Sequence, residues 1–427
     1  MTSRRRTTAI CLLLTALLAI CPLASFAQSK KILHSFQSGT DGALSDTNLI
    51  PDGSGGFYGM THVGGSSNCG GYGCGTFFHL TQSAGAWTET VLYSFPGTPD
   101  VSQPTFELVR DKAGNFYGTS LGGGPVNWGT VFELSPPSAT GGAWTETILY
   151  SFTGGLDGGF PFGGVVFGLN GGLYGVTAYG GPYKTGDCYN NGCGVIFQLL
   201  PPSQKGGAWT ESPIYNFNPF EVTMGDVRLA VDQQGRLFGA NGNDYPHPSI
   251  FMLSPQTDGS WLYGQIYSFT GGVDGEVPDS GLIFDKAGNL YGTSMGGQSI
   301  GGTVFQLLPP ADGSNNWTFN ILHSFAGPPT DGYAPAARLT LDQQGNLYGI
   351  TTGGGFAAKG CYYGCGTVFE LSPSSSGTWT ATLLHRFIGG NDGYEPQAPV
   401  TVSGGVVYGT TWLGGSANSG TIFAIRP

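Results

Sequence analysis

Four short sequence markers recur seven times in the same order, and this repetition limits the folds that the chain can adopt. Each unit ends with a phenylalanine that is usually preceded by serine, and these residues stand 52 to 65 positions apart: Phe36, Phe95, Phe152, Phe217, Phe269, Phe325 and Phe387. Aromatic–glycine pairs begin at Tyr58, Tyr117, Tyr174, Phe238, Tyr291, Tyr348 and Tyr408. Segments close to Thr-Val-Phe centre on Phe77, Val131, Ile196, Ile250, Val304, Val368 and Ile422. A tryptophan follows in six units, at Trp87, Trp144, Trp209, Trp261, Trp317 and Trp379. A fixed period of this kind indicates a repeat architecture.

Each unit predicts four short β-strands. In the fifth unit these are 282–284, 290–294, 303–307 and 317–325, separated by a hairpin turn at 285–289 and by loops at 295–301 and 309–316. Aromatic and β-branched residues crowd the strands, as half-buried sheets prefer. One four-stranded unit cannot bury both of its faces, whereas seven units packed around an axis can, so the sequence predicts an all-β, seven-bladed β-propeller. An open β-solenoid is the alternative, but solenoid coils of roughly 20–30 residues are shorter than these units.

The phase of the repeat indicates a closed ring. Residues 31–36 form a lone fourth strand that precedes the first unit, and residues 421–425 form a third strand that no fourth strand follows. We therefore expect the N-terminal strand to complete the last blade and to cover both free sheet edges. The expected domain is 28–427, with repeats at about 37–95, 96–152, 153–217, 218–269, 270–325, 326–387, and 388–427 plus 28–36.

The first 27 residues predict a signal peptide. Three arginines, Arg4 to Arg6, precede an apolar run from Ala9 to Ala19, and Ser25-Phe26-Ala27 is suited to cleavage. The expected location is secreted, periplasmic or at the cell surface, with no transmembrane segment in the mature chain. Residues 1–27 hold three of the 16 basic and none of the 27 acidic residues, so the mature chain carries a formal net charge of −14. Such a surface repels nucleic acid, which excludes that partner.

The composition agrees with an all-β protein that has many tight turns. Glycine and proline supply 76 and 27 of the 427 residues, while 13% of the residues are aromatic and 10% are charged. The aromatic content supports a packed core, and the low charge excludes a highly charged helical protein.

The repeat resembles a known family. Gly288-Asn289-Leu290-Tyr291-Gly292-Thr293, then Gly296-Gly297, then Gly302-Thr303-Val304-Phe305 is similar to the GloVer tandem repeat of exported bacterial proteins. The resemblance covers almost the whole mature chain. It implies a β-propeller-like fold and export, often with a choice-of-anchor tail at the C-terminus. It implies no particular activity.

Six cysteines of the mature chain form three close pairs, each before a third strand: Cys69 and Cys74, Cys188 and Cys193, Cys361 and Cys365. In an exported protein such pairs favour local disulfides. Metal binding is the alternative, but two sulfurs do not complete a zinc site and no histidine accompanies them.

An Asp-Gly pair also recurs between blades, at Asp41, Asp157, Asp274, Asp331 and Asp392. These aspartates are weak metal candidates, because Asp-Gly is also a turn signal and no calcium-loop spacing accompanies it.

Aromatic residues in the glycine-rich loops between second and third strands are the candidate ligand-binding residues: Trp128, Trp412, Tyr72, Tyr189 and Tyr362. Such rings can stack on a sugar or anchor a protein, or they can pack between blades. In the fourth unit, Asp244, Tyr245 and His247 replace the Gly-Gly loop, through drift or as a specialised notch. Glu89, Glu146 and Glu211 share one slot of the outer strand and are expected to be solvated.

No motif for catalysis stands out. The sequence contains no Gly-x-Ser-x-Gly, no His-Glu-x-x-His and no phosphate-binding loop, and it predicts no cofactor and no catalytic residue. The leading hypothesis is an exported, non-catalytic propeller that binds a glycan or a protein. Two alternatives stay open: a propeller hydrolase or lyase acting on polysaccharide, which would need unique polar residues near the axis, and a structural surface-assembly module.

Overall fold

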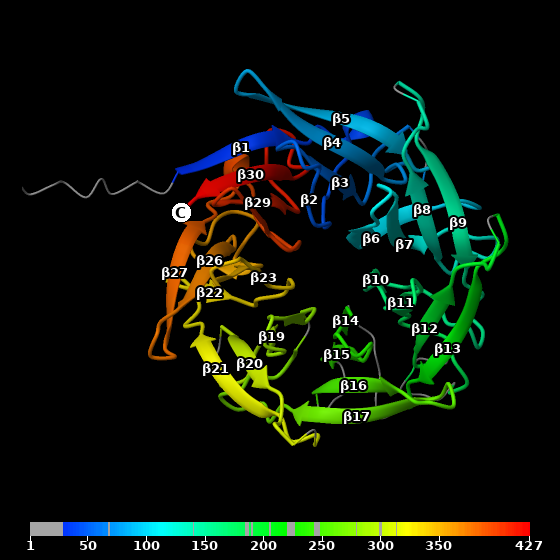
Figure 1. The fold of residues 1–427 in the computed structure, drawn as a ribbon. Helices are drawn as coiled ribbons and strands as arrows, with labels where there is room; N and C mark the ends of the chain where they lie inside the picture. Colours follow the sequence, from blue (N-terminus) through cyan, green and yellow to red (C-terminus); the bar gives the residue numbers. More distant parts are fainter. Residues whose placement is uncertain are drawn as a thin grey trace, which may run out of the picture.

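Seven four-stranded antiparallel sheets form the blades of a propeller in this computed structural model (Figure 1). The structure describes residues 29–427 except 67–68, 140, 184–187, 189–190, 205, 220–226, 243–247, 279, 299–300 and 313. The expected signal peptide, the unit-four residues Asp244, Tyr245 and His247, and Tyr189 therefore lie outside the described residues. The prediction of a seven-bladed, all-β propeller is confirmed.

In blades 1 to 6 the strands run outward from the axis in chain order, whereas in blade 7 the outermost strand is β1. Blade 1 comprises β2 (Ile50–Pro51), β3 (Phe57–Thr61), β4 (Thr76–Ser83) and β5 (Ala86–Ser94). Blade 2 comprises β6 (Ser102–Arg110), β7 (Phe116–Gly122), β8 (Thr130–Ser135) and β9 (Thr145–Ser151). Blade 3 comprises β10 (Val165–Phe167), β11 (Leu173–Val176), β12 (Val195–Leu200) and β13 (Thr210–Asn216). Blade 4 comprises β14 (Ala230–Val231), β15 (Leu237–Asn241), β16 (Ser249–Pro255) and β17 (Trp261–Ser268). Blade 5 comprises β18 (Ile283–Phe284), β19 (Leu290–Ser294), β20 (Thr303–Leu308) and β21 (Thr318–Ser324).

The last two blades carry small additions. Blade 6 comprises β23 (Thr340–Leu341), β24 (Leu347–Thr351), β26 (Thr367–Pro373) and β27 (Trp379–Arg386), with a two-stranded ribbon of β22 (Gly332–Tyr333) and β25 (Gly353–Gly354). Blade 7 comprises β28 (Thr401–Ser403), β29 (Val406–Thr411), β30 (Thr421–Arg426) and β1 (Ser29–Ser35). Short 3₁₀ turns lie at η1 (Gly39–Asp41) and η3 (Gly390–Asp392). Within the described part of the chain, no helix is long and apolar enough to span a bilayer.

The two ends of the described chain meet in blade 7. Strand β1 pairs antiparallel with β30 from Ser29 opposite Arg426 to Ser35 opposite Thr421. Figure 1 shows the blue N-terminal strand lying beside the red C-terminal strand, outermost in its blade. The pairing confirms that the N-terminal strand closes the last blade, and it leaves β30 with partners on both sides.

Three of the four sequence markers form one contact that repeats at every junction between blades. The terminal phenylalanine of one blade packs edge-on against the third-strand phenylalanine of the next, as Phe95 does on Phe132 with ring centroids 5.4 Å apart. The ring of Phe132 lies over Gly118, where an added Cβ would approach the ring to 2.7 Å. The other six junctions pair Phe36 with Phe78, Phe152 with Phe197, Phe217 with Phe251, Phe269 with Phe305, Phe325 with Phe369, and Phe387 with Phe423. The aromatic–glycine pair therefore recurs because each third-strand ring occupies the space of a side chain on the second strand.

Removing the closing strand should destabilise the whole ring. A chain that lacks residues 28–38 loses all of β1, exposes the edge of β30 and removes Phe36, whose side chain is fully buried. Loss of one buried phenylalanine alone costs about 3–5 kcal/mol. We expect the truncated chain to be insoluble or to melt well below the parent, whereas Lys31→Ala, an exposed change on the same strand, should melt close to the parent. Equal melting temperatures for the truncated and parent chains would contradict ring closure.

Candidate functional site

Two sets of loops share one face of the ring, which we call the loop face. It is formed by the loops between second and third strands and by the connections from one blade to the next. The two sets contact each other directly through isolated bridges that pair Ala43 with Val63, Gly159 with Tyr179, Val277 with Met295, and Tyr394 with Leu413. Thus the loops that hold the predicted cysteines and aromatics lie with the Asp-Gly connections.

Exposed apolar side chains gather on the loop face. Thirteen large apolar residues are exposed in the described chain, and nine of them lie in these loops: Tyr72, Val126, Leu156, Tyr183, Val273, Phe356, Tyr362, Tyr363 and Ile388. The opposite face contributes only Leu169 and Leu200 to this set. The loop face is therefore the more apolar of the two faces, and it is the face on which we look for an interaction surface.

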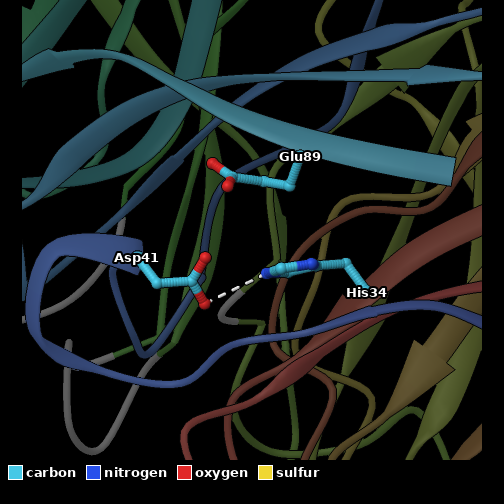
Figure 2. A group of neighbouring side chains, drawn as sticks. All are labelled: His34, Asp41 and Glu89. Carbon is cyan, nitrogen blue, oxygen red and sulfur yellow. Dashed lines mark hydrogen bonds and ion pairs between the residues drawn. The ribbon is translucent and has the colours of Figure 1, made fainter.

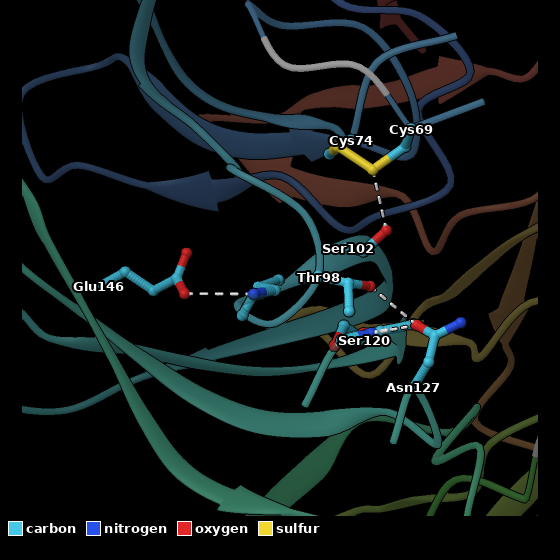
Figure 3. The surroundings of a disulfide bond; sticks show 10 residues. Cys69, Cys74, Thr98, Ser102, Ser120, Asn127 and Glu146 are labelled. Carbon is cyan, nitrogen blue, oxygen red and sulfur yellow. Dashed lines mark hydrogen bonds between the residues drawn. A yellow bond between two sulfur atoms is a disulfide. The ribbon is translucent and has the colours of Figure 1, made fainter. Parts of the chain in front are cut away.

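The three predicted disulfides are present, and they lie beneath the loop face. They join Cys69 to Cys74, Cys188 to Cys193 and Cys361 to Cys365. Figure 3 shows the first bridge, between Cys69 and Cys74. This bridge packs against Gly97 in the connection to blade 2, where an added Cβ would lie 2.7 Å from Cys74 Sγ. The third contacts Gly389, the equivalent residue two positions after a terminal phenylalanine, where an added Cβ would lie 3.5 Å from Cys365 Sγ. Each of these two bridges therefore supports the connection that follows its own blade.

Trp128 occupies the equivalent place in blade 2, which has no disulfide. Its ring packs on Gly154, the counterpart of Gly97, where an added Cβ would approach the indole to 2.4 Å. The ring also lies 4.9 Å from Phe160 in an edge-on arrangement, and its side chain is half-buried. This geometry suits a packing role between blades better than an open platform for a ligand.

Trp412 also lies at a junction, between blades 7 and 1. Its half-buried ring is 5.8 Å from His62 of blade 1, and its backbone N–H donates to the carbonyl of Glu395 at 3.0 Å. Burial lowers the pKa of His62. Trp128 and Trp412, the two tryptophans singled out in the sequence, therefore both pack against neighbouring loops.

Two of the three predicted tyrosines are strongly exposed, and both lie inside disulfide loops. Tyr72 is 78% exposed between Cys69 and Cys74, and Tyr362 is 83% exposed between Cys361 and Cys365. Tyr363, which the sequence analysis did not select, is 73% exposed and stacks on Tyr333 at 5.9 Å. A short covalent loop limits the conformations of the ring it carries, which lowers the entropy lost when a ligand binds.

A groove of about 530 Å³ lies beside Tyr72, between blades 1 and 2. Its walls carry the side chains of Thr98, Ser102, Gln103 and Asn127, and none of its lining residues is charged. The Asn127 side-chain oxygen accepts hydrogen bonds from Thr98 at 3.1 Å and from the Gly123 N–H at 2.8 Å, which fixes its amide (Figure 3). The groove thus presents hydroxyl and amide groups next to an exposed ring.

The Asp-Gly aspartates stabilise turns between the blades. Asp157 accepts a hydrogen bond from the Thr153 N–H at 2.8 Å and another from the Tyr150 hydroxyl at 3.1 Å. Asp41, Asp274, Asp331 and Asp392 bind backbone N–H groups in the same way, and each faces a histidine or tyrosine of the preceding strand. These hydrogen bonds are the contacts of residues that stabilise turns, which is one of the two roles considered from the sequence. The five aspartates each bind within their own connection and do not form one ring of metal ligands.

The three glutamates of the outer strands are not solvated, and that expectation is wrong. Glu89, Glu146 and Glu211 are partly buried, and each has one carboxylate oxygen that is inaccessible and has no hydrogen-bond partner among the described residues. Burial and the charge of Asp41 raise the pKa of Glu89 to about 8. Burial raises the pKa of Glu146 to about 7, and burial together with Asp157 does the same for Glu211. The cause is the connection from the preceding blade, which places Asp41 beside Glu89, Asp100 beside Glu146 and Asp157 beside Glu211.

An ion pair crosses the axis of the ring, and the sequence analysis missed it. Arg338 of blade 6 binds Glu107 of blade 2 through Nε and Nη2, at 3.0 and 2.7 Å, and Arg228 of blade 4 lies 3.9 Å from the same carboxylate. These blades are not neighbours, so their inner ends meet only across the centre (Figure 1). All three residues directly precede a buried leucine, which is Leu108 within the first strand of blade 2 and Leu229 or Leu339 just before the first strand of blades 4 and 6. That shared slot is the signal that could have found them.

Comparisons with known proteins identify a repeat family and similar solved structures. The family model for the Gloeobacter/Verrucomicrobia repeat matches residues 22–189, 67–293 and 245–427. A fungal alcohol oxidase in complex with copper is similar in structure, with a TM-score of 0.56 and 13% identity over 94% of this chain and 76% of that chain. A putative 6-phosphogluconolactonase from Bacteroides uniformis gives a TM-score of 0.46 and 13% identity, over 78% and 83% of the two chains. A protein of unknown function from Dyadobacter fermentans gives 0.42 and 12%, over 93% and 96%. No curated protein matches the chain.

The buried glutamates predict a specific pH dependence. The folded protein holds a proton on Glu211 up to about pH 7, whereas the unfolded chain releases this proton near pH 4.5. The contribution of this proton to the free energy of unfolding is therefore complete below pH 4.5, falls as the pH rises to about 7, and then stays constant. Glu211→Gln stays neutral at every pH. The melting temperature of this variant minus that of the parent should therefore increase from pH 4.5 to 7, with the same trend for Glu146→Gln. A difference that is constant over this range would show that the glutamates are not desolvated.

Proposed function

We propose that this chain, which belongs to the Gloeobacter/Verrucomicrobia repeat family, is an exported, non-catalytic propeller that binds an uncharged glycan on its loop face. The observation that carries the proposal is the groove beside Tyr72, which combines an exposed aromatic ring with hydroxyl and amide groups and has no charged lining residue. Sugar rings stack on flat aromatic faces while their hydroxyls form hydrogen bonds, so this chemistry suits a neutral glycan.

Export is supported by the disulfides and by the N-terminal sequence. Local disulfides persist in oxidising compartments outside the cytosol, and residues 1–27 have the pattern of a signal peptide. The bridges also have a role in this proposal, because they hold Tyr72 and Tyr362 in short loops at the surface. A protein partner would use the same exposed rings, and it is the competing outcome of the test.

A glycosidase would need two carboxyl groups that are free to exchange protons with a substrate. Glu107, the carboxylate of the axial ion pair, does not fit this role, because both of its carboxylate oxygens are bound by Arg338. Such an arrangement supports a structural function that ties blades 2 and 6 across the centre. The loop face, with its exposed rings, supports binding.

A glycan array combined with a reducing-sugar assay tests the proposal. We expect binding to one or more neutral glycans without release of reducing ends. Tyr72→Ala should weaken that binding at least about fivefold with an unchanged melting temperature, because an aromatic anchor contributes roughly 1–3 kcal/mol. Tyr72→Phe, which keeps the ring, should bind like the parent.

Trp128→Ala is the matched control for structure. We expect it to lower the melting temperature, because the indole fills the space beneath the loop connection at Gly154. Released sugar would contradict the non-catalytic assignment. Glycan binding that survives Tyr72→Ala would place the site elsewhere, and binding to proteins alone would replace the glycan with a protein partner.

A further inference from the structure

The seven junctions between blades share one position on the outer strand, and its occupant differs from blade to blade. This junction slot is the fourth-strand residue that lies opposite a buried Leu or Ile of the third strand, as Glu89 lies opposite Leu80. In blades 1 to 7 the slot holds Glu89, Glu146, Glu211, Tyr263, Phe319, Ala381 and Lys30. The slot residue lies beside the connection that enters its blade: Glu89 is close to Asp41, Glu146 to Asp100, Glu211 to Asp157 and Lys30 to Asp392. This connection carries an Asp-Gly pair at five of the seven junctions, whereas the one between blades 1 and 2 carries Asp100-Val101.

A cation fills the slot at the junction of blades 6 and 7. The Lys30 ammonium lies 2.6 Å from Asp392 Oδ1 and also donates to the Asp392 carbonyl, while His385 Nε2 lies 3.0 Å from Asp392 Oδ2. The side chain of Lys30 is only 7% exposed. A positive charge on the slot residue is therefore accommodated beside the pair of His385 and Asp392.

The next junction, between blades 7 and 1, has the same His–Asp pair but a carboxylate in the slot. His34 Nε2 lies 3.1 Å from Asp41 Oδ2, and Glu89 reaches toward both from β5 (Figure 2). One ligand atom from each of the three side chains lies within 4.8 Å of the other two. Oε1 of Glu89 is inaccessible and has no hydrogen-bond partner in the described part of the chain. Two carboxylates and an imidazole thus converge where the equivalent junction holds an ammonium.

We propose that His34, Asp41 and Glu89 bind a divalent first-row transition metal such as Zn²⁺. One imidazole nitrogen and two carboxylate oxygens are a ligand set that Zn²⁺ accepts, with water in the fourth position. Two ligands at roughly 2.0–2.2 Å from one ion are at most about 4.4 Å apart, so small side-chain rotations bring the three atoms into place. The nitrogen ligand disfavours Ca²⁺ and Mg²⁺, which take oxygen ligands.

The metal would fasten the junction at which the ring closes. His34 belongs to β1, Asp41 to the turn η1 and Glu89 to β5, so one ion would join the N-terminal strand, the connection that follows it and blade 1. Among the described junctions, no other combines all three ligands. His323 and Asp331 face Ala381, whereas Asp157 and Glu211 face Tyr150 in place of a histidine.

Isothermal titration with ZnCl₂ near neutral pH, on metal-free protein with its disulfides formed, tests this site. We expect one equivalent to bind and the melting temperature to rise. Glu89→Lys copies the arrangement of Lys30, so this variant should fold without metal and lose that equivalent. His34→Tyr copies the Tyr150 junction, and it should weaken binding by more than about 100-fold, because loss of a supporting residue alone costs ~10–100-fold.

Two further variants complete the design. His323→Tyr removes a histidine from a matched His–Asp pair that lacks the glutamate, and it should leave the bound equivalent unchanged. Tyr150→His should create a second equivalent with Asp157 and Glu211. The proposal is overturned if the parent binds no Zn²⁺, or if the bound equivalent survives both Glu89→Lys and His34→Tyr.

Discussion

Every blade depends on the same aromatic contact with its neighbour. A terminal phenylalanine inserts edge-on against a third-strand phenylalanine of the next blade, and that ring in turn lies over a glycine of the second strand. These phenylalanines are nearly or fully buried, so their apolar surface is a main source of stability between sheets. Each blade provides the terminal phenylalanine to the next blade and receives one from the blade before it. The seventh such contact forms only when blade 7 meets blade 1 through Phe36 and Phe78.

This shared contact leaves other positions free to differ between blades. Beneath the loop face, the same space is filled by a disulfide in blades 1 and 6 and by Trp128 in blade 2. In the junction slot, carboxylates, aromatic rings, alanine and lysine replace one another. At the axis, Glu107 and Arg338 join two distant blades. The specialised chemistry of the molecule therefore lies in the residues that the repeat does not fix.

Contacts that are local in sequence were predictable, and contacts between blades were not. Strand bounds in the fifth unit differ from the predicted ones by a single residue, because turn and strand signals act over a few positions. Cysteines four or five residues apart indicated their own partners. By contrast, the burial of Glu89, Glu146 and Glu211 arises from a connection that belongs to the preceding blade, and Trp128 packs against a loop of the next. The sequence contains no local sign of either environment. Tyr189 and the unit-four notch lie outside the described residues and stay predictions.

The closed ring is the central claim, because the loop face, the junction slot at Glu89 and the axial ion pair all require seven blades in register. Hydrogen exchange followed by mass spectrometry tests it without altering the sequence. In the closed ring, the amides of β1 that pair with β30 should be protected to a degree similar to those of β5 and β9, the outer strands of blades 1 and 2. Exchange of residues 29–35 at the rate of an unprotected peptide, while β5 and β9 stay protected, would show that the N-terminal strand does not close the ring.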